Sequence, residues 1–67
     1  MQKIILMPIE KFDRTEIMLI EGQAISDDKT VELQERGAMF YDLEEFTQDC
    51  NDQLICLDSI WITYAFI

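Results

Sequence analysis

The fold is decided by the stretch Lys3-Ile4-Ile5-Leu6-Met7-Pro8, a continuous apolar run that ends at the only proline of the chain. Isoleucine favours strands because its branched side chain packs well on a pleated surface. A short apolar run without alternation is typical of a strand whose two faces are both covered. We therefore expect residues 3–7 to form a short strand that is buried on both faces.

The next part of the chain predicts two further strands joined as a hairpin. Ile17-Met18-Leu19-Ile20 lies at the centre of a predicted strand over residues 16–26. The residues that follow, 26–29, have the composition of a turn, and residues 30–34 alternate apolar and polar side chains. These patterns indicate a hairpin from the second strand into a third.

A helix over residues 26–37 is the alternative to the third strand. Ser26 would be the N-cap of this helix, and Gly37 would follow its C-terminus. The strand is favoured because Val31 and Leu33 would point to different sides of a helix.

The clearest helix signal covers Asp42–Asp52, after an extended segment at residues 38–41. Asp42 and Glu45 have the spacing of a capping box, in which two side chains satisfy backbone N–H groups at a helix start. Apolar or small side chains then follow at i, i+3, i+4 and i+7, and they would share one face of a helix. These residues are Leu43, Phe46, Thr47 and Cys50.

The chain ends with its longest strand signal, from Ile55 to Ile67. Strand alternation places Ile60, Ile62, Tyr64 and Phe66 on one face, and Ser59, Trp61, Thr63 and Ala65 on the other. Such an apolar strand invites aggregation at an exposed edge, so we expect it to be central or covered by a second copy. We expect Trp61 and Thr63 to face outward.

Together these elements predict one small α+β domain over residues 1–67. Its expected architecture is an antiparallel sheet of about four strands packed against one amphipathic helix, in the order β-β-β-α-β.

Charge limits the partners that the chain can bind. Its 67 residues include 14 Asp and Glu, 5 Lys and Arg and no His, which gives a formal charge of −9. Residues 1–36 hold eight acids and all five cations, a net charge of −3, whereas residues 37–67 hold six acids and no cation, a net charge of −6. Direct binding to nucleic acid or to an anionic membrane is not expected, because it depends on Lys and Arg.

The common catalytic and metal-binding motifs are missing. Without His the chain has no material for the usual triads or for His-based metal sites. Gly22 and Gly37 lie too far apart for a phosphate-binding loop, and Cys50 and Cys56 lie too far apart for a C-x-x-C site. We therefore expect no enzyme activity, no cofactor and no metal.

The compartment is inferred from the cysteines and from the apolar segments. We expect reduced thiols, although the spacing leaves open whether Cys50 and Cys56 pair. No secretory signal is visible, and the apolar C-terminal stretch is too short to span a bilayer. The cytoplasm is the expected location, and for a phage-encoded protein it would be the host cytoplasm.

A protein-binding surface is the remaining possibility. An acidic helix face is usually just solvated and turn acids are usually just turn residues, but the C-terminal half has no cation to relieve its charge. A large aromatic residue on the last strand is a further candidate for binding, although packing in the core is its commonest role. The candidate partner-binding residues are Asp42, Glu44, Glu45, Asp49 and Asp52 on the helix, Asp27, Asp28 and Glu32 around the turn, and Trp61.

In size, acidity and lack of catalytic groups, the chain resembles the small phage-encoded antagonists of host defence. This class includes anti-CRISPR proteins, restriction inhibitors and uracil-DNA glycosylase inhibitors. Ile5-Leu6-Met7-Pro8 is similar to an apolar stretch of the glycosylase inhibitors, but Lys3-Ile4 replaces the acidic residue and serine that should precede it. No functional residue is transferred from that family.

Two functions of different classes follow as hypotheses. The first is an inhibitor whose carboxylates occupy phosphate sites on a basic nucleic-acid-binding protein, and an immunity protein against a basic nuclease toxin would use the same physics. The second is a small structural or regulatory subunit whose C-terminal strand pairs with a copy of itself or extends a partner's sheet. A homodimer is compatible with both hypotheses.

Overall fold

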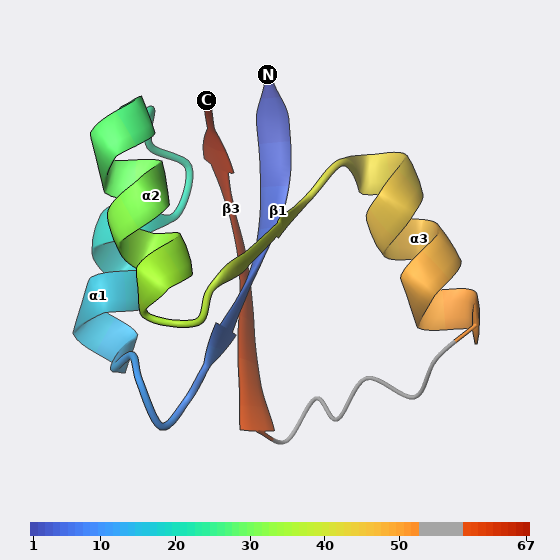
Figure 1. Ribbon diagram of the computed structural model, residues 1–67, viewed down its shortest axis with the longest axis horizontal. Coiled ribbons are helices and arrows are strands. Elements are labelled where there is room, and N and C mark those ends of the chain that lie inside the picture. Colours follow the sequence, from blue (N-terminus) through green and yellow to red (C-terminus); the bar gives the residue numbers. More distant parts are fainter. Residues whose placement is uncertain (53–58) are drawn as a thin grey trace.

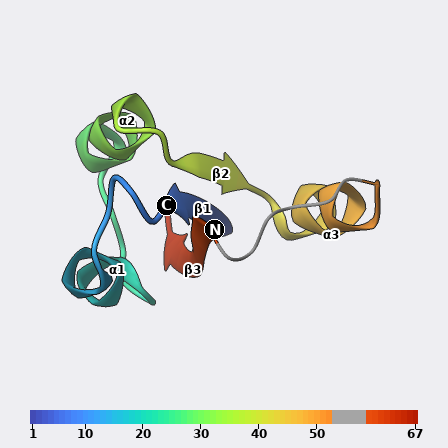
Figure 2. The same cartoon turned by 90° about the horizontal axis from the view of Figure 1, so that it is seen from below.

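β1 (Gln2–Pro8) is the central strand of a three-stranded antiparallel sheet, with β2 (Met39–Tyr41) on one side and β3 (Ile60–Phe66) on the other (Figures 1 and 2). The computed structural model describes residues 1–52 and 59–67. The strand predicted over residues 3–7 is confirmed, and Ile5, Leu6 and Met7 are buried.

The three helices of the described chain lie on both sides of this sheet. α1 (Arg14–Ile20) and α2 (Asp27–Glu35) lie on one side, and α3 (Leu43–Asp52) lies on the other (Figure 2). The buried cluster forms between the sheet and the first two helices, and it contains Ile5, Met7, Phe12, Ile17, Ile20, Leu33, Ala38 and Ala65. The result is a small α+β fold, but the described residues form three strands instead of about four, and the element order differs from the prediction.

The strand predicted over residues 16–26 is wrong, because its first part forms α1. Asp13 is the N-cap of this helix, and its Oδ1 accepts a hydrogen bond from the Glu16 backbone N–H at 2.8 Å. Ile17 and Ile20 are buried on one face of the helix, whereas Met18 and Leu19 are exposed. The apolar run is therefore a helix with one buried side, and strand alternation does not describe it.

The strand predicted over residues 30–34 is also wrong, and the helical alternative is right. Ser26 caps α2 by accepting a hydrogen bond from the Lys29 backbone N–H at 3.1 Å, and Gly37 follows the helix with a φ of 105°. The objection that Val31 and Leu33 point apart does not hold, since α2 buries Leu33 alone and leaves Val31 51% exposed.

β3 lies at an edge of the sheet, so the expectation of a central position is wrong, and cover by a second copy stays a prediction. Its outer edge is partly covered by the chain itself, since the Gly22 N–H donates to the Tyr64 carbonyl and the Phe66 N–H donates to the Gln23 carbonyl. The Ile25 N–H completes this short parallel contact by donating to the Phe66 carbonyl. The prediction that the strand begins at residue 55 concerns positions that lie outside the described residues.

The two faces of β3 are the reverse of those predicted. Thr63 lies opposite Ile5, and Trp61 lies opposite Met7, so both residues share the face that packs on α1 and α2. Thr63 is only 4% exposed, whereas Tyr64 and the other residues of its face are partly open to solvent. The alternation was predicted correctly, but it does not say which face meets the core.

The predicted helix at residues 42–52 is confirmed as α3. The Asp42 backbone N–H donates to Glu45 Oε2 at 3.3 Å, as in a capping box, and the Phe46 N–H donates to the Asp42 carbonyl at 2.9 Å. Tyr41 and Phe46 meet edge-to-face with ring centroids 6.5 Å apart, which holds the start of the helix against β2.

Candidate functional site

The predicted acidic residues at the start of α3 divide into one structural residue and two exposed residues. Asp42 is half-buried, and its carboxylate forms an ion pair with Lys3 of β1, which joins the helix start to the sheet. Glu44 and Glu45 are exposed, and neither forms an ion pair with a described residue. Asp49 and Asp52 belong to the same helix, beyond the side chains that the structure describes.

A second set of predicted acids lies on α2. Asp27 and Asp28 occupy the first turn, where carboxylates interact favourably with the helix dipole, and both are exposed. Glu32 lies one turn further along, with its Oε2 3.7 Å from Lys29 Nζ. No described cation forms an ion pair with either Asp27 or Asp28.

The fold does not bring the two acidic sets together. α2 and α3 lie on opposite sides of the sheet (Figures 1 and 2). The predicted candidate residues therefore form two separate acidic surfaces, which we call the α2 surface (Asp27, Asp28 and Glu32) and the α3 surface (Glu44 and Glu45). A partner with one compact basic site could contact only one of them at a time.

Trp61 is placed with the core instead of on a binding face. Its indole packs against the buried cluster, and its Nε1–H donates a hydrogen bond to the Phe12 carbonyl at 3.0 Å. This bond satisfies the polar atom of a large aromatic side chain and fastens the segment before α1 to β3. A partner-binding role for Trp61 has no support from this geometry.

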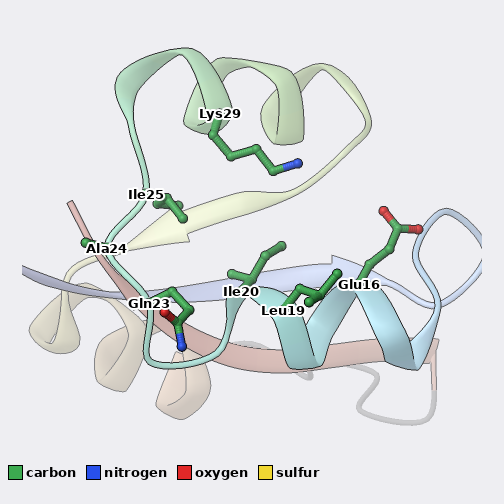
Figure 3. Close-up of a pocket in the computed structure, with 7 residues that line it drawn as sticks. All are labelled: Glu16, Leu19, Ile20, Gln23, Ala24, Ile25 and Lys29. Carbon is green, nitrogen blue, oxygen red and sulfur yellow. The ribbon is translucent and has the colours of Figure 1, made fainter.

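A cleft of about 330 Å³ lies between α1 and α2, beside the α2 surface. Its walls combine apolar and polar side chains. Leu19 and Ile20 come from α1, and Ala24 and Ile25 come from the segment that leads to α2. Glu16, Gln23 and Lys29 supply the polar part of the lining. Figure 3 shows the Lys29 side chain reaching from α2 over the apolar side chains of α1. The volume falls in the range of sites that hold a side chain or a small ligand.

The charges that line the cleft are largely compensated. Glu16 accepts from both terminal nitrogens of Arg36, with Oε2–Nη1 at 2.7 Å and Oε1–Nη2 at 3.1 Å. These hydrogen bonds hold the pKa of the Glu16 carboxyl below its ordinary value and raise the pKa of Arg36. Lys29 has Glu32 as its neighbour. The interior of the cleft therefore carries little net charge.

Arg36 connects three parts of the chain at this point. Besides its contact with Glu16, its Nη2 donates to the Lys11 carbonyl at 2.7 Å, and its guanidinium carbon lies 4.4 Å from the centre of the Phe12 ring. A planar guanidinium can make this set of contacts at once, whereas a lysine ammonium cannot. Arg36 thus connects the C-terminal end of α2 to α1 and to the segment before α1.

The sequence interpretation missed the cleft because it missed α1. A signal was present, since Asp13 and Glu16 have capping-box spacing, and Phe12 and Ile17 have the spacing of a hydrophobic staple. Both apolar residues of this staple are in the buried cluster. The same capping-box spacing, at Asp42 and Glu45, correctly predicts α3.

Two further kinds of site are absent from the described residues. They contain no group of three or more metal-ligating side chains and no helix that is long and apolar enough to cross a membrane. No family model matches the chain, and no curated protein or solved structure matches it.

Proposed function

We propose that the protein is a non-catalytic inhibitor that binds a basic nucleic-acid-binding protein and competes with the nucleic acid for it. A basic nuclease is one such partner, and the cytoplasm is where the two would meet. The observation that carries this proposal is which charged side chains of the fold form ion pairs and which do not. Lys3, Lys29 and Arg36 form ion pairs within the chain. The carboxylates of Asp27, Asp28, Glu44 and Glu45 are exposed and form no ion pair with a described residue.

These two acidic surfaces can attract a basic protein without help from each other. The Debye length is about 10 Å at 0.1 M salt, close to the radius of gyration of 11.3 Å. Near this salt concentration, each surface acts mainly through its own carboxylates. Such a field accelerates association with a cationic partner and repels nucleic acid.

Charge reversal on one surface tests this proposal. The double variant Glu44→Lys/Glu45→Lys changes the α3 surface, and Asp27→Lys/Asp28→Lys changes the α2 surface. Glu10→Lys/Glu21→Lys is the matched control, since both residues are exposed, lie outside the two surfaces and give the same change in net charge. Each protein is used to capture partners from nuclease-treated lysate, and the captured proteins are then assayed for nucleic-acid binding.

We expect at least one surface variant to lose the captured protein, while the control retains it. The purified complex should dissociate as salt rises, and added nucleic acid should displace the inhibitor. A partner that binds the inhibitor and nucleic acid together, or whose affinity ignores salt and both reversals, would contradict the proposal.

Self-association or pairing with a partner's sheet through β3 is the second candidate, and the position of this strand favours it. Ile62, Tyr64 and Phe66 are partly exposed along one face of an edge strand. Residues 22–25 already bond to the outer edge at Tyr64 and Phe66, so only the part near Ile62 is open among the described residues. Light scattering at tens of micromolar, repeated after dilution, tests for a dimer, and a monomer of unchanged stability would count against self-association.

A further inference from the structure

We propose that the cleft between α1 and α2 receives one large apolar side chain from a basic segment of the partner. This inference rests on the proposed function, and it adds an anchor to the electrostatic attraction. Protein interfaces commonly concentrate their binding energy in one or a few side chains that enter such pockets.

The apolar part of the cleft lining, formed by Leu19, Ile20, Ala24 and Ile25, suits an apolar anchor. Ile20 is buried, Ile25 is half-buried, and Leu19 is 72% exposed at the rim. When a partner side chain enters the cleft, this exposed leucine would lose apolar surface to the contact, and the burial of that surface would favour binding. The volume of about 330 Å³ is sufficient for a phenylalanine or leucine side chain.

The electrostatics favour an uncharged anchor between cationic neighbours. Both carboxylate oxygens of Glu16 already bond to Arg36, so they offer little to an incoming cation inside the cleft. An anionic ligand for Lys29 would meet Glu32 beside it, and Asp27 and Asp28 in the same helix. Lysine or arginine residues on either side of the anchor would instead lie near the unpaired carboxylates of Asp27 and Asp28.

A second copy of the chain is a poor occupant of the cleft. Each copy carries a formal charge of −9. The exposed apolar residues of α1 lie between Glu16 and Glu21, and those of β3 have no Lys or Arg nearby in the sequence. A basic segment gains attraction from the same acids that make two copies repel.

Two synthetic peptides separate the anchor from the charge. Each is a five-residue amidated peptide with four lysines, and the central residue is phenylalanine in one and serine in the other. Titrations followed by NMR should shift the amides of Ile20, Ala24 and Ile25, and the wild-type protein should bind the phenylalanine peptide about tenfold more tightly. This ratio of affinities measures the contribution of the apolar side chain to binding, because both peptides carry the same lysines.

Leu19→Ser should reduce the ratio to about twofold or less, since it removes the apolar rim. Met18→Ser is the matched control, because Met18 is 63% exposed on the same helix and does not line the cleft. It should leave the ratio near tenfold. Both substitutions are at exposed positions. A urea titration followed by the fluorescence of Trp61, which packs against the buried cluster, verifies that each variant is folded.

Charge variants test the underlying function separately. Asp27→Asn/Asp28→Asn should weaken the binding of both peptides by the same factor and leave the ratio of affinities unchanged. Lys29→Gln should strengthen the binding of both.

Equal affinities for the two peptides, or equal effects of Leu19→Ser and Met18→Ser, would overturn the proposed apolar anchor without contradicting the role of the acidic surface. Weaker binding of both peptides in Lys29→Gln would show that their lysines do not lie beside α2, and it would overturn the inference. Affinities indifferent to salt and to Asp27→Asn/Asp28→Asn would overturn the role of the α2 surface.

Discussion

At the scale of single residues, Gly22 has little freedom to change. It ends the turn after α1 with a φ of +73°, and a Cβ at this position would lie 3.3 Å from the Tyr64 hydroxyl oxygen. Its backbone N–H also donates to the Tyr64 carbonyl at 2.9 Å. The turn therefore needs glycine both for its backbone conformation and for the close approach of the tyrosine ring.

Gly22→Ala should lower the free energy of unfolding by about 1–2 kcal/mol, as measured by urea titration. Adding Tyr64→Phe to this variant should recover part of the loss, because it removes the oxygen nearest the new methyl group. The remaining loss belongs to the left-handed backbone. An alanine variant as stable as the wild type would show that the turn has another accessible conformation.

Glu16 links stability to pH. Its hydrogen bonds from Arg36 lower its pKa from the ordinary value of 4.5. A carboxyl whose pKa is lower in the folded protein contributes stability above its unfolded pKa, and that contribution disappears as pH falls through the folded-state pKa.

Glu16→Gln should therefore be less stable than the wild type at neutral pH, and the difference should shrink as the solution is acidified below about pH 4.5. Urea titrations across the acid range measure this difference. Glu10→Gln is the matched control, since this exposed carboxylate has no ion pair with a described residue. If the stability difference between Glu16→Gln and the wild type stays constant down to the most acidic condition, the ionised Glu16 carboxylate does not stabilise the fold.

At the scale of secondary-structure elements, short helices depend on their caps. α1 has seven residues, too few to be stable as an isolated helix. It forms because Asp13 satisfies the Glu16 N–H and because Ile17 and Ile20 pack into the buried cluster. Burial and capping thus override the β-propensity of its isoleucines.

Asp13→Ala should lower the free energy of unfolding by about 1 kcal/mol, measured by urea titration with circular dichroism. Asp13→Asn should retain most of the stability, since the amide oxygen can still accept the hydrogen bond. Thr15→Ala, which changes an exposed residue in the same turn, should cost nothing. Equal losses at positions 13 and 15 would show that the cap is unimportant.

At the scale of the whole molecule, salt should have opposite effects on stability and on binding. The formal charge of −9 makes the compact state repel itself, and three ion pairs among the described residues relieve only part of this repulsion. Screening therefore favours folding, whereas it weakens attraction to a basic partner.

Raising the salt concentration from about 0.01 to 0.5 M should raise the thermal unfolding midpoint and reduce affinity for the lysine peptides. Calorimetry and the NMR titrations give the two readouts on the same protein. The variant Glu10→Gln/Glu21→Gln, with two charges fewer, should show a smaller rise in the midpoint. A midpoint that falls with salt would mean that attraction between opposite charges outweighs the self-repulsion.

Sequence patterns predicted the elements whose signals are local. β1 follows from one apolar run, and α3 follows from a capping box and a helical spacing that neighbouring residues satisfy among themselves. α2 was recognised only as the alternative, and α1 was missed, although both have N-cap residues that are visible in the chain. Among the candidate binding residues, Asp27, Asp28, Glu44 and Glu45 are exposed, while Asp42 and Trp61 are held in structural contacts.

By itself the sequence determined the net charge, the lack of histidine, the strand at residues 3–7 and the acidic helix, because these are properties of composition or of residues close together in the chain. Only the tertiary structure decided which face of β3 is buried, since both faces are apolar and the register against β1 makes the choice. It also placed the two acidic sets on opposite sides of the sheet and formed the cleft between α1 and α2. Those features depend on packing between distant segments, which no local pattern records.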